Sequence, residues 1–371
     1  MKNIKHHYMR TTFSLFLFLA SFAAVWAQIP VGYYDSAEEK SMQELKTALH
    51  HIIKTGHIEL DFNANNARFW WDNYFKQADW HPDGYFWDMY STDRHATYLG
   101  GTIQNREHCM PRSWWQIGTG SNIDYGEANG DLHNLYPANE AANSAKSNFP
   151  LGITANTTFN NGVVRVGSSA IAIGGYTASV FEPANEYKGD FARTYMYMVT
   201  RYENYSNRWR STGTSTMLQN NTYPTLTTYA INLLMDWHRN DPVSQKEIDR
   251  NNAVQRIQQN RNPFIDHPDL AEYIWGSYKG ESWLPGATIA EFGVFYPNGV
   301  GDRIEISVSR RAGERIHYEI YSITGLQLLS GELPANNTLT LTELSNGMYI
   351  LAVYAGSQRH TVRILVGRGK K

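Results

Sequence analysis

The spacing of apolar residues changes once along this chain, after Glu291, and the change predicts two folded units. Before it, apolar residues recur at helical intervals, as in residues 45–53 and 226–238. After it, apolar and polar residues alternate in short runs punctuated by glycines, which is typical of a small all-β sandwich. We therefore expect an α+β fold class, with a mostly helical domain at 28–291 and a β-sandwich at 292–371. A length of 371 residues suits this division, because domains usually contain roughly 100–200 residues.

The first 27 residues have the features of a secretory signal peptide. Three basic residues precede an apolar run over residues 13–24, which is too short to span a bilayer comfortably. Val25 and Ala27 then place small residues at the −3 and −1 positions of a cleavage site, so Gln28 is the expected mature start. The alternative is a retained N-terminal anchor. We expect no transmembrane segment after cleavage.

Local signals place further elements in the first domain. Residues 190–202 have helical spacing, and Ser244 followed by Glu247 predicts a capping box for a helix over 245–259. Residues 153–182 contain short alternating runs that predict hairpin strands.

Cysteine usage and charge limit the function classes. The single cysteine, Cys109, cannot form an internal disulfide, so stability must come from the core. The chain has 33 Lys/Arg and 35 Asp/Glu, of which the leader holds three basic residues and residues 292–371 hold nine basic and six acidic ones. Residues 28–291 therefore keep 21 basic and 29 acidic residues, a net charge of −8. This balance disfavours broad electrostatic capture of nucleic acid, and any phosphate-binding surface must be a local patch.

Residues 101–108 end a predicted strand with Arg106, Glu107 and His108 in succession. These three side chains suit phosphodiester hydrolysis. An imidazole with a pKa of ~6.5 can take a proton from water, a carboxylate is a hard ligand for Mg²⁺, and a guanidinium can clamp phosphate. In an extended segment Glu107 and His108 would face opposite sides, so we expect a local bend to bring them together.

A second polar segment, residues 130–150, surrounds a predicted short helix. Asn139 and Asn143 are four residues apart and would share one helical face, where an amide oxygen could complete a metal site. The alternative is a helix with Asn and Ser caps.

These motifs closely resemble the endonuclease I family of secreted and periplasmic bacterial nucleases, which belong to the ββα-metal (His-Me finger) superfamily. The resemblance covers residues 40–285. Four further blocks share it: residues 87–91, 188–193, 237–243 and 259–266. It implies a nuclease domain that contains a ββα-metal finger and cleaves DNA without sequence preference, with RNA left open as a second substrate. Unlike several disulfide-rich relatives, this chain has one cysteine, and its expected catalytic domain is acidic overall, which disfavours tight binding to long duplex DNA.

The resemblance also implies roles for individual residues. His108 corresponds to the general base, and Glu107 and Asn143 correspond to ligands of Mg²⁺, for which Mn²⁺ could substitute. The expected products carry 5′-phosphate and 3′-hydroxyl ends.

The remaining expected site residues would contact substrate. Arg106, assigned with the catalytic group, and Arg193 lie in blocks where a cation could meet phosphate. Asp131 and His133 could shape the site or orient its ligands, and His133 is also a candidate substrate contact, although a packed structural role fits both residues equally well. The candidate contacts to the DNA backbone are Lys146, Ser147 and Asn148.

Three segments of the last domain, residues 295–298, 320–325 and 344–350, are similar to the type A sorting domain of the type IX secretion system. The resemblance implies that the secretion machinery is a partner. The protein would pass through the periplasm and be released or attached to the outer-membrane surface. A carbohydrate-binding or adhesive sandwich is the alternative for this domain.

Three other functions stay open for the whole chain. The main one is a nuclease-like fold that has lost activity and serves as a surface binding module. A zinc hydrolase acting on peptide or glycan is disfavoured because no His-Glu-x-x-His motif occurs. A surface adhesin carried by the sorting domain is the third.

Overall fold

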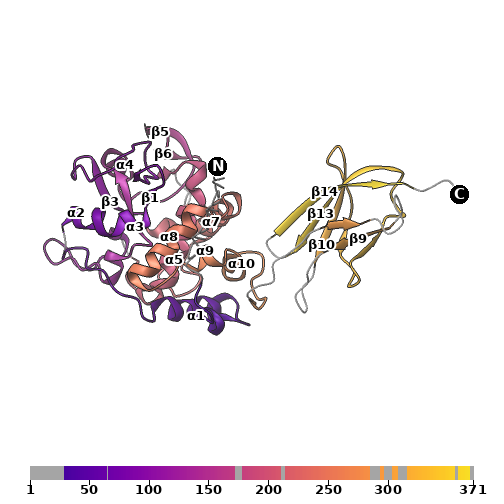
Figure 1. Cartoon of the computed structure of the whole chain (residues 1–371), viewed down its shortest axis with the longest axis horizontal. Coiled ribbons are helices and arrows are strands. Elements are labelled where there is room, and N and C mark those ends of the chain that lie inside the picture. The colour runs from indigo at the N-terminus through magenta and orange to yellow at the C-terminus, as the bar shows by residue number, and fades with distance from the viewer. Residues whose placement is uncertain are drawn as a thin grey trace, which may run out of the picture.

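A computed structural model (Figure 1) describes residues 29–64, 66–171, 178–209, 214–284, 293–295, 303–307, 316–355 and 358–367. The expected signal peptide and the expected boundary between residues 291 and 292 lie outside the described residues.

The first unit combines helices with short sheets. Its helices are α1 (Met42–Lys54), α2 (Ala67–Trp70), α3 (Lys76–Ala78), α4 (Glu140–Lys146), α5 (Lys188–Arg201), α6 (Thr214–Met217), α7 (Thr228–Asn240), α8 (Gln245–Gln258), α9 (Pro263–Asp266) and α10 (Leu270–Ile274). Its strands are β1 (Trp80–His81), β2 (Tyr85–Phe86), β3 (Gln104–His108), β4 (Leu135–Asn139), β5 (Thr154–Asn160), β6 (Arg165–Ser169) and β7 (Ser179–Glu182). Helices and sheets in one chain confirm the α+β class.

Helix α5 forms the centre of this unit (Figure 1), and every residue from Gly189 to Arg201 is buried. It packs against α1, α7 and α9. The helices predicted over residues 190–202, 226–238 and 245–259 are confirmed as α5, α7 and α8, within one to two residues at most ends. The capping box at the start of α8 is also confirmed, since the Ser244 and Glu247 side chains each bond the other residue's backbone N–H.

An aromatic cluster supports the strand that faces the site. Trp70, Trp71 and Phe75 pack in one apolar cluster with Leu135 of β4 and Val254 of α8. The turn of π-helix that follows α2, η2 (Trp71–Phe75), contacts β4. The burial of these large rings fixes β4 against the helical body.

The described residues of this unit form three small antiparallel sheets, of which β1 with β2 is one. Strands β3 and β4 pair in regular register, with Glu107 opposite Tyr136 and His108 opposite Leu135. Helix α4 follows β4 without a loop and contacts both strands. Strands β5, β6 and β7 form the third sheet, which confirms the hairpin strands predicted within residues 153–182.

Strands are the only regular secondary structure among the described residues from Gly293 onward. They are β8 (Gly293–Phe295), β9 (Arg303–Ser307), β10 (His317–Ser322), β11 (Gln327–Glu332), β12 (Thr338–Thr340), β13 (Gly347–Ala355) and β14 (Gln358–Val366). They make two sheets, β11-β10-β13-β14 and β12-β9-β8, whose pairs are all antiparallel. Both sheets contribute to one apolar cluster, for example through Ile304 of β9 and Leu351 of β13. Across the described parts of the chain, no helix has the length and apolar character needed to cross a membrane.

Candidate active site

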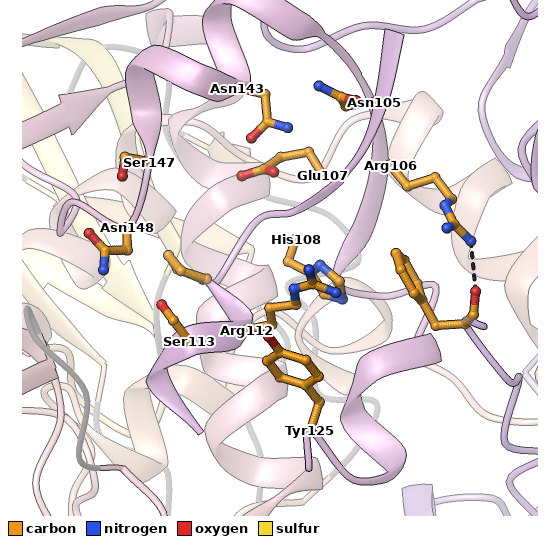
Figure 2. A pocket seen from close by; sticks show the side chains of 12 residues that line it. Asn105, Arg106, Glu107, His108, Arg112, Ser113, Tyr125, Asn143, Ser147 and Asn148 are labelled. Carbon is orange, nitrogen blue, oxygen red and sulfur yellow. Dashed lines mark hydrogen bonds between the residues drawn. The ribbon is translucent and has the colours of Figure 1, made fainter. Parts of the chain in front are cut away.

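One pocket of the first unit is lined by residues from both polar segments, 101–108 and 130–150. It has a volume of about 490 Å³ and lies where β3 ends, next to the last turn of α4 (Figure 2). The residues that line it are Phe62, Asn105, Arg106, Glu107, His108, Pro111, Arg112, Ser113, Tyr125, Asn143, Ser147 and Asn148. The structure therefore brings together six of the ten expected site residues.

The residue Asn134 fixes the backbone directly after His108. Its side-chain Oδ1 accepts from Met110 N at 2.7 Å, and its Nδ2 donates to Met110 O at 3.0 Å. Cys109 N donates to the Asn134 backbone oxygen, so the β3–β4 pairing continues past His108. Both Glu107 and His108 line the pocket. The pairing of β3 with β4 continues through both residues without a register shift, so the expected local bend is not a β-bulge.

His108 is oriented by a main-chain carbonyl. Its Nε2 lies 2.9 Å from the backbone oxygen of Asn129. A carbonyl can only accept, so Nε2 carries the proton and Nδ1 of the neutral ring keeps its lone pair. The ring is buried and packs near Phe62 and Trp115, at centroid distances of 5.3 and 6.0 Å.

Burial changes the protonation of His108 relative to an ordinary histidine. It lowers the pKa of His108 to about 3, and the nearby cations Arg112 and Lys146 act in the same direction. The near-neutral pKa assumed from residue type is therefore wrong for the free protein. At neutral pH the imidazole is therefore uncharged, and its Nδ1 lone pair is not used by the bond to Asn129.

Glu107 is a buried carboxylate with one cationic partner. Its Oε1 accepts from Lys146 Nζ at 2.6 Å. Burial raises the pKa of Glu107, while the Lys146 ammonium and its hydrogen bond oppose this rise. The ammonium thus favours the charged carboxylate that a metal site needs.

The two asparagines expected on one face of α4 have different roles. Asn139 is the N-cap, and its Oδ1 accepts from Ala142 N at 3.0 Å. Asn143, one turn later, points into the pocket towards Glu107 (Figure 2). Capping therefore accounts for Asn139 and leaves the Asn143 amide for the pocket.

Arg106 lies flat against an aromatic ring at the pocket wall. Its guanidinium carbon is 3.6 Å from the centre of the Phe62 ring, and NH1 donates to Phe62 O at 2.9 Å. Burial lowers the pKa of Arg106 to about 10. These contacts fix the side chain beside the pocket.

Sequence reasoning missed four residues that shape the site: Phe62, Arg112, Tyr125 and the Asn129 carbonyl. The Arg112 guanidinium lies 4.5 Å from the centre of the Tyr125 ring and lines the pocket (Figure 2). A basic residue four positions after His108 was a usable signal. The sequence gives no comparable signal for Phe62 or for the Asn129 carbonyl, because only the tertiary fold brings these two segments next to His108.

Three expected substrate contacts are buried away from solvent, which corrects those assignments. Arg193 is 1% exposed and binds both carboxylate oxygens of Glu247. His133 is buried and lies against the Tyr197 ring at 4.5 Å. Lys146 is 0% exposed and faces Glu107. Solvent cannot reach these side chains, so a nucleic acid cannot contact them in this structure.

Asp131, the other residue of uncertain role, is a buried acceptor in the core. It accepts from the hydroxyls of Tyr197 and Tyr202 at 2.7 and 2.8 Å and from Gln258 Nε2 at 2.7 Å. It also accepts from His133 N, which stabilises the turn before β4. Its contribution to the site is to hold the scaffold.

The donor set at the pocket fits a hard divalent cation. Glu107 and Asn143 present a carboxylate and an amide oxygen towards the same space, and Mg²⁺ is usually held by one or two such ligands with several waters. No group of three His, Cys, Asp or Glu side chains suited to a metal occurs among the described residues. Zinc sites usually have three or four nitrogen, sulfur or carboxylate ligands, and the carboxylate and amide of this pocket differ from that pattern.

Comparison with known proteins gives two family matches. The Endonuclease I family model matches residues 41–269, and the Secretion system C-terminal sorting domain matches residues 294–367. An extracellular ribonuclease of Bacillus amyloliquefaciens is 33% identical, over 66% of this chain and 78% of its own length. An extracellular ribonuclease of Bacillus subtilis is 32% identical, over 70% of this chain and 83% of its own. An extracellular deoxyribonuclease of Aeromonas hydrophila is 25% identical, over 43% and 64%.

Proposed function

Because this chain belongs to the endonuclease I family and is a secreted endonuclease, we propose that it hydrolyses phosphodiester bonds of DNA and RNA at the pocket of Glu107, His108 and Asn143. The observation that carries this proposal is the convergence on one pocket of a neutral, oriented imidazole, a buried carboxylate and an amide. The names of the similar proteins support both substrates, since they include ribonucleases and a deoxyribonuclease.

Glu107 and Asn143 would hold Mg²⁺, with Mn²⁺ able to substitute. When bound, the ion supplies positive charge that stabilises the phosphorane-like transition state and the departing 3′-oxygen. The Lys146 ammonium, 2.6 Å from Oε1, favours the charged form of Glu107 that this role needs.

His108 would act as the general base. The Asn129 carbonyl holds Nε2–H, so Nδ1 is the atom that takes a proton from the attacking water. Phe62 and Trp115 hold the ring in place and keep water from its faces. Attack on phosphorus opposite the 3′-oxygen yields 5′-phosphate and 3′-hydroxyl ends.

The pocket rim would bind the backbone of the substrate. Arg112 is the cation best placed for a non-bridging phosphate oxygen, and Ser147 and Asn148 can donate or accept nearby. Arg106 supports Phe62 and contributes positive potential beside the pocket. Contacts of this kind to the backbone give little sequence preference.

The β3–β4 pair with α4 would be the ββα-metal finger, and the two C-terminal sheets would form the sandwich that the type IX secretion machinery recognises. Antiparallel pairing of β3 with β4, directly followed by the helix that carries Asn143, supports the first assignment. The apolar cluster shared by both sheets and the sorting-domain match support the second.

The test is digestion of plasmid DNA and of RNA by the purified mature chain. His108→Ala should cut at least about 10²-fold more slowly, and EDTA should abolish cutting of both substrates. His51→Ala, on the exposed side of α1, is the matched control and should cut like wild type. If His108→Ala cuts like wild type, His108 is not the base. Binding without hydrolysis in Mg²⁺ or Mn²⁺ would favour the alternative, an inactive nuclease-like binding module.

A further inference from the structure

Lys146 is the buried cation of the pocket, and it contacts two consecutive residues of β3. Its Nζ lies 2.6 Å from Glu107 Oε1 and 3.2 Å from the backbone oxygen of His108. Lys146 is 0% exposed and Glu107 is 7% exposed. One ammonium therefore connects the expected metal ligand to the main chain of the expected base.

The position of Lys146 on α4 makes this link specific. Lys146 follows Asn143 by three residues, so the two side chains emerge from the same side of the short helix. Asn143 reaches the pocket, while Lys146 lies underneath and approaches Glu107 from the protein interior. Helix α4 thus supplies one ligand directly and positions the other through a hydrogen bond.

The chain contains a second pair with the same chemistry but another location. Lys46 of α1 is also 0% exposed, and its Nζ lies 2.9 Å from Oε2 of Glu203. Neither residue lines the pocket. The two pairs are nearly identical in burial and charge. Comparing variants of Lys146 with variants of Lys46 therefore distinguishes a local effect on the site from the general loss of stability when a buried ion pair is broken.

We propose that Lys146 is a positioning residue for the metal site, which holds the Glu107 carboxylate in one orientation before the cation binds. This inference rests on the proposed function, because it assumes that Glu107 is a metal ligand. Partners that orient a metal ligand from behind typically contribute about 10- to 100-fold to metal affinity or activity. A merely structural lysine would change stability and leave metal affinity unchanged.

The experiment measures Mn²⁺ binding to the full mature chain, by electron paramagnetic resonance of the free ion, without substrate. Lys146→Met should weaken Mn²⁺ binding about 10- to 100-fold. Lys146→Arg keeps the charge and donors and should bind Mn²⁺ more tightly than Lys146→Met. Lys46→Met should bind Mn²⁺ like wild type. Circular dichroism identifies the temperature range in which each variant is folded.

Each outcome decides the role of Lys146. Mn²⁺ affinity of Lys146→Met within twofold of wild type would overturn the proposal, as would equal losses in Lys146→Met and Lys46→Met. Equal losses in Lys146→Met and Lys146→Arg would assign the effect to disrupted packing and also overturn it. Glu107→Gln separates this failure from failure of the proposed function. If Glu107→Gln binds Mn²⁺ like wild type, Glu107 is not a ligand and both proposals fail. If only Glu107→Gln loses binding, the metal site stands and the positioning role is rejected.

Discussion

Arg193→Met tests whether the arginine that ends the block at residues 188–193 serves the scaffold or the substrate. In the structure Arg193 Nε and NH2 donate to the two oxygens of Glu247 at 2.5 and 2.9 Å, and NH1 donates to Asp241 O at 2.8 Å. Methionine would fill similar volume but leave the Glu247 carboxylate, 2% exposed, without its cation. Breaking a buried ion pair from one side costs about 3–5 kcal/mol. We expect the free energy of unfolding to fall by about this amount.

A double variant checks the physical reason for that loss. Burial already raises the pKa of Glu247, so removal of Arg193 makes the charged carboxylate still less favourable. Glutamine at position 247 removes the charge and can still serve in the capping box with Ser244. Arg193→Met/Glu247→Gln should therefore be more stable than Arg193→Met alone.

Urea unfolding at pH 7, followed by tryptophan fluorescence, measures these changes in the first unit, because no tryptophan follows Trp283. Kinetics at a temperature where Arg193→Met is folded should give a KM for nucleic acid within twofold of wild type. A tenfold rise in KM with unchanged stability would refute the structural role and restore Arg193 as a substrate contact.

Two further predictions concern acid stability and phosphate binding. Burial lowers the pKa of His108 and His133 to about 3 and of His238 to about 4, so only the unfolded chain takes up these protons as the pH falls below ~6.5. The free energy of unfolding is therefore highest above that pH and declines towards the folded-state pKa values, by about 2 kcal/mol per histidine at pH 5. In urea titrations between pH 8 and 5, His238→Asn should reduce this decline by about the contribution of one histidine. An unchanged decline would contradict the lowered pKa of His238. Arg112→Ala should lower kcat/KM about 10- to 100-fold, since a hydrogen bond to a charged group contributes about 1.5–3 kcal/mol. Arg106→Ala should cost less, because Phe62 already engages that guanidinium; a larger loss in Arg106→Ala than in Arg112→Ala would reverse their roles.

Several features of the site were predictable because they depend on residues close in sequence. Glu107 and His108 are adjacent, and Asn143 follows Asn139 by one helical turn, so a strand and a short helix place them with few alternatives. The capping box of α8 was equally local, since Ser244 and Glu247 bond each other across three residues. Local periodicity and capping signals therefore predicted the main helices, whereas the ligand roles expected for Glu107 and Asn143 came from the family resemblance.

The roles of the cations could not be predicted in this way. Arginine and lysine next to a catalytic motif look alike in sequence whether they face solvent or the interior. Lys146 and Arg193 are buried because Glu107 and Glu247 lie where the fold brings them, at separations of 39 and 54 residues. Arg112 instead faces the pocket beside Tyr125.

The sequence alone determined the family, the division of the chain by hydrophobic period, and the residue types that could hold a metal and take a proton. The hydrophobic period and the arrangement within each motif depend on spacings of one to four residues, which a strand or a helix converts directly into position. The family resemblance instead rests on motif blocks spread over residues 40–285. Only the tertiary structure decided that His108 is neutral with Nδ1 available, because the carbonyl of Asn129 and the burying rings come from distant segments. It also decided which cations are buried, because desolvation and ion pairing depend on packing between segments that the sequence separates.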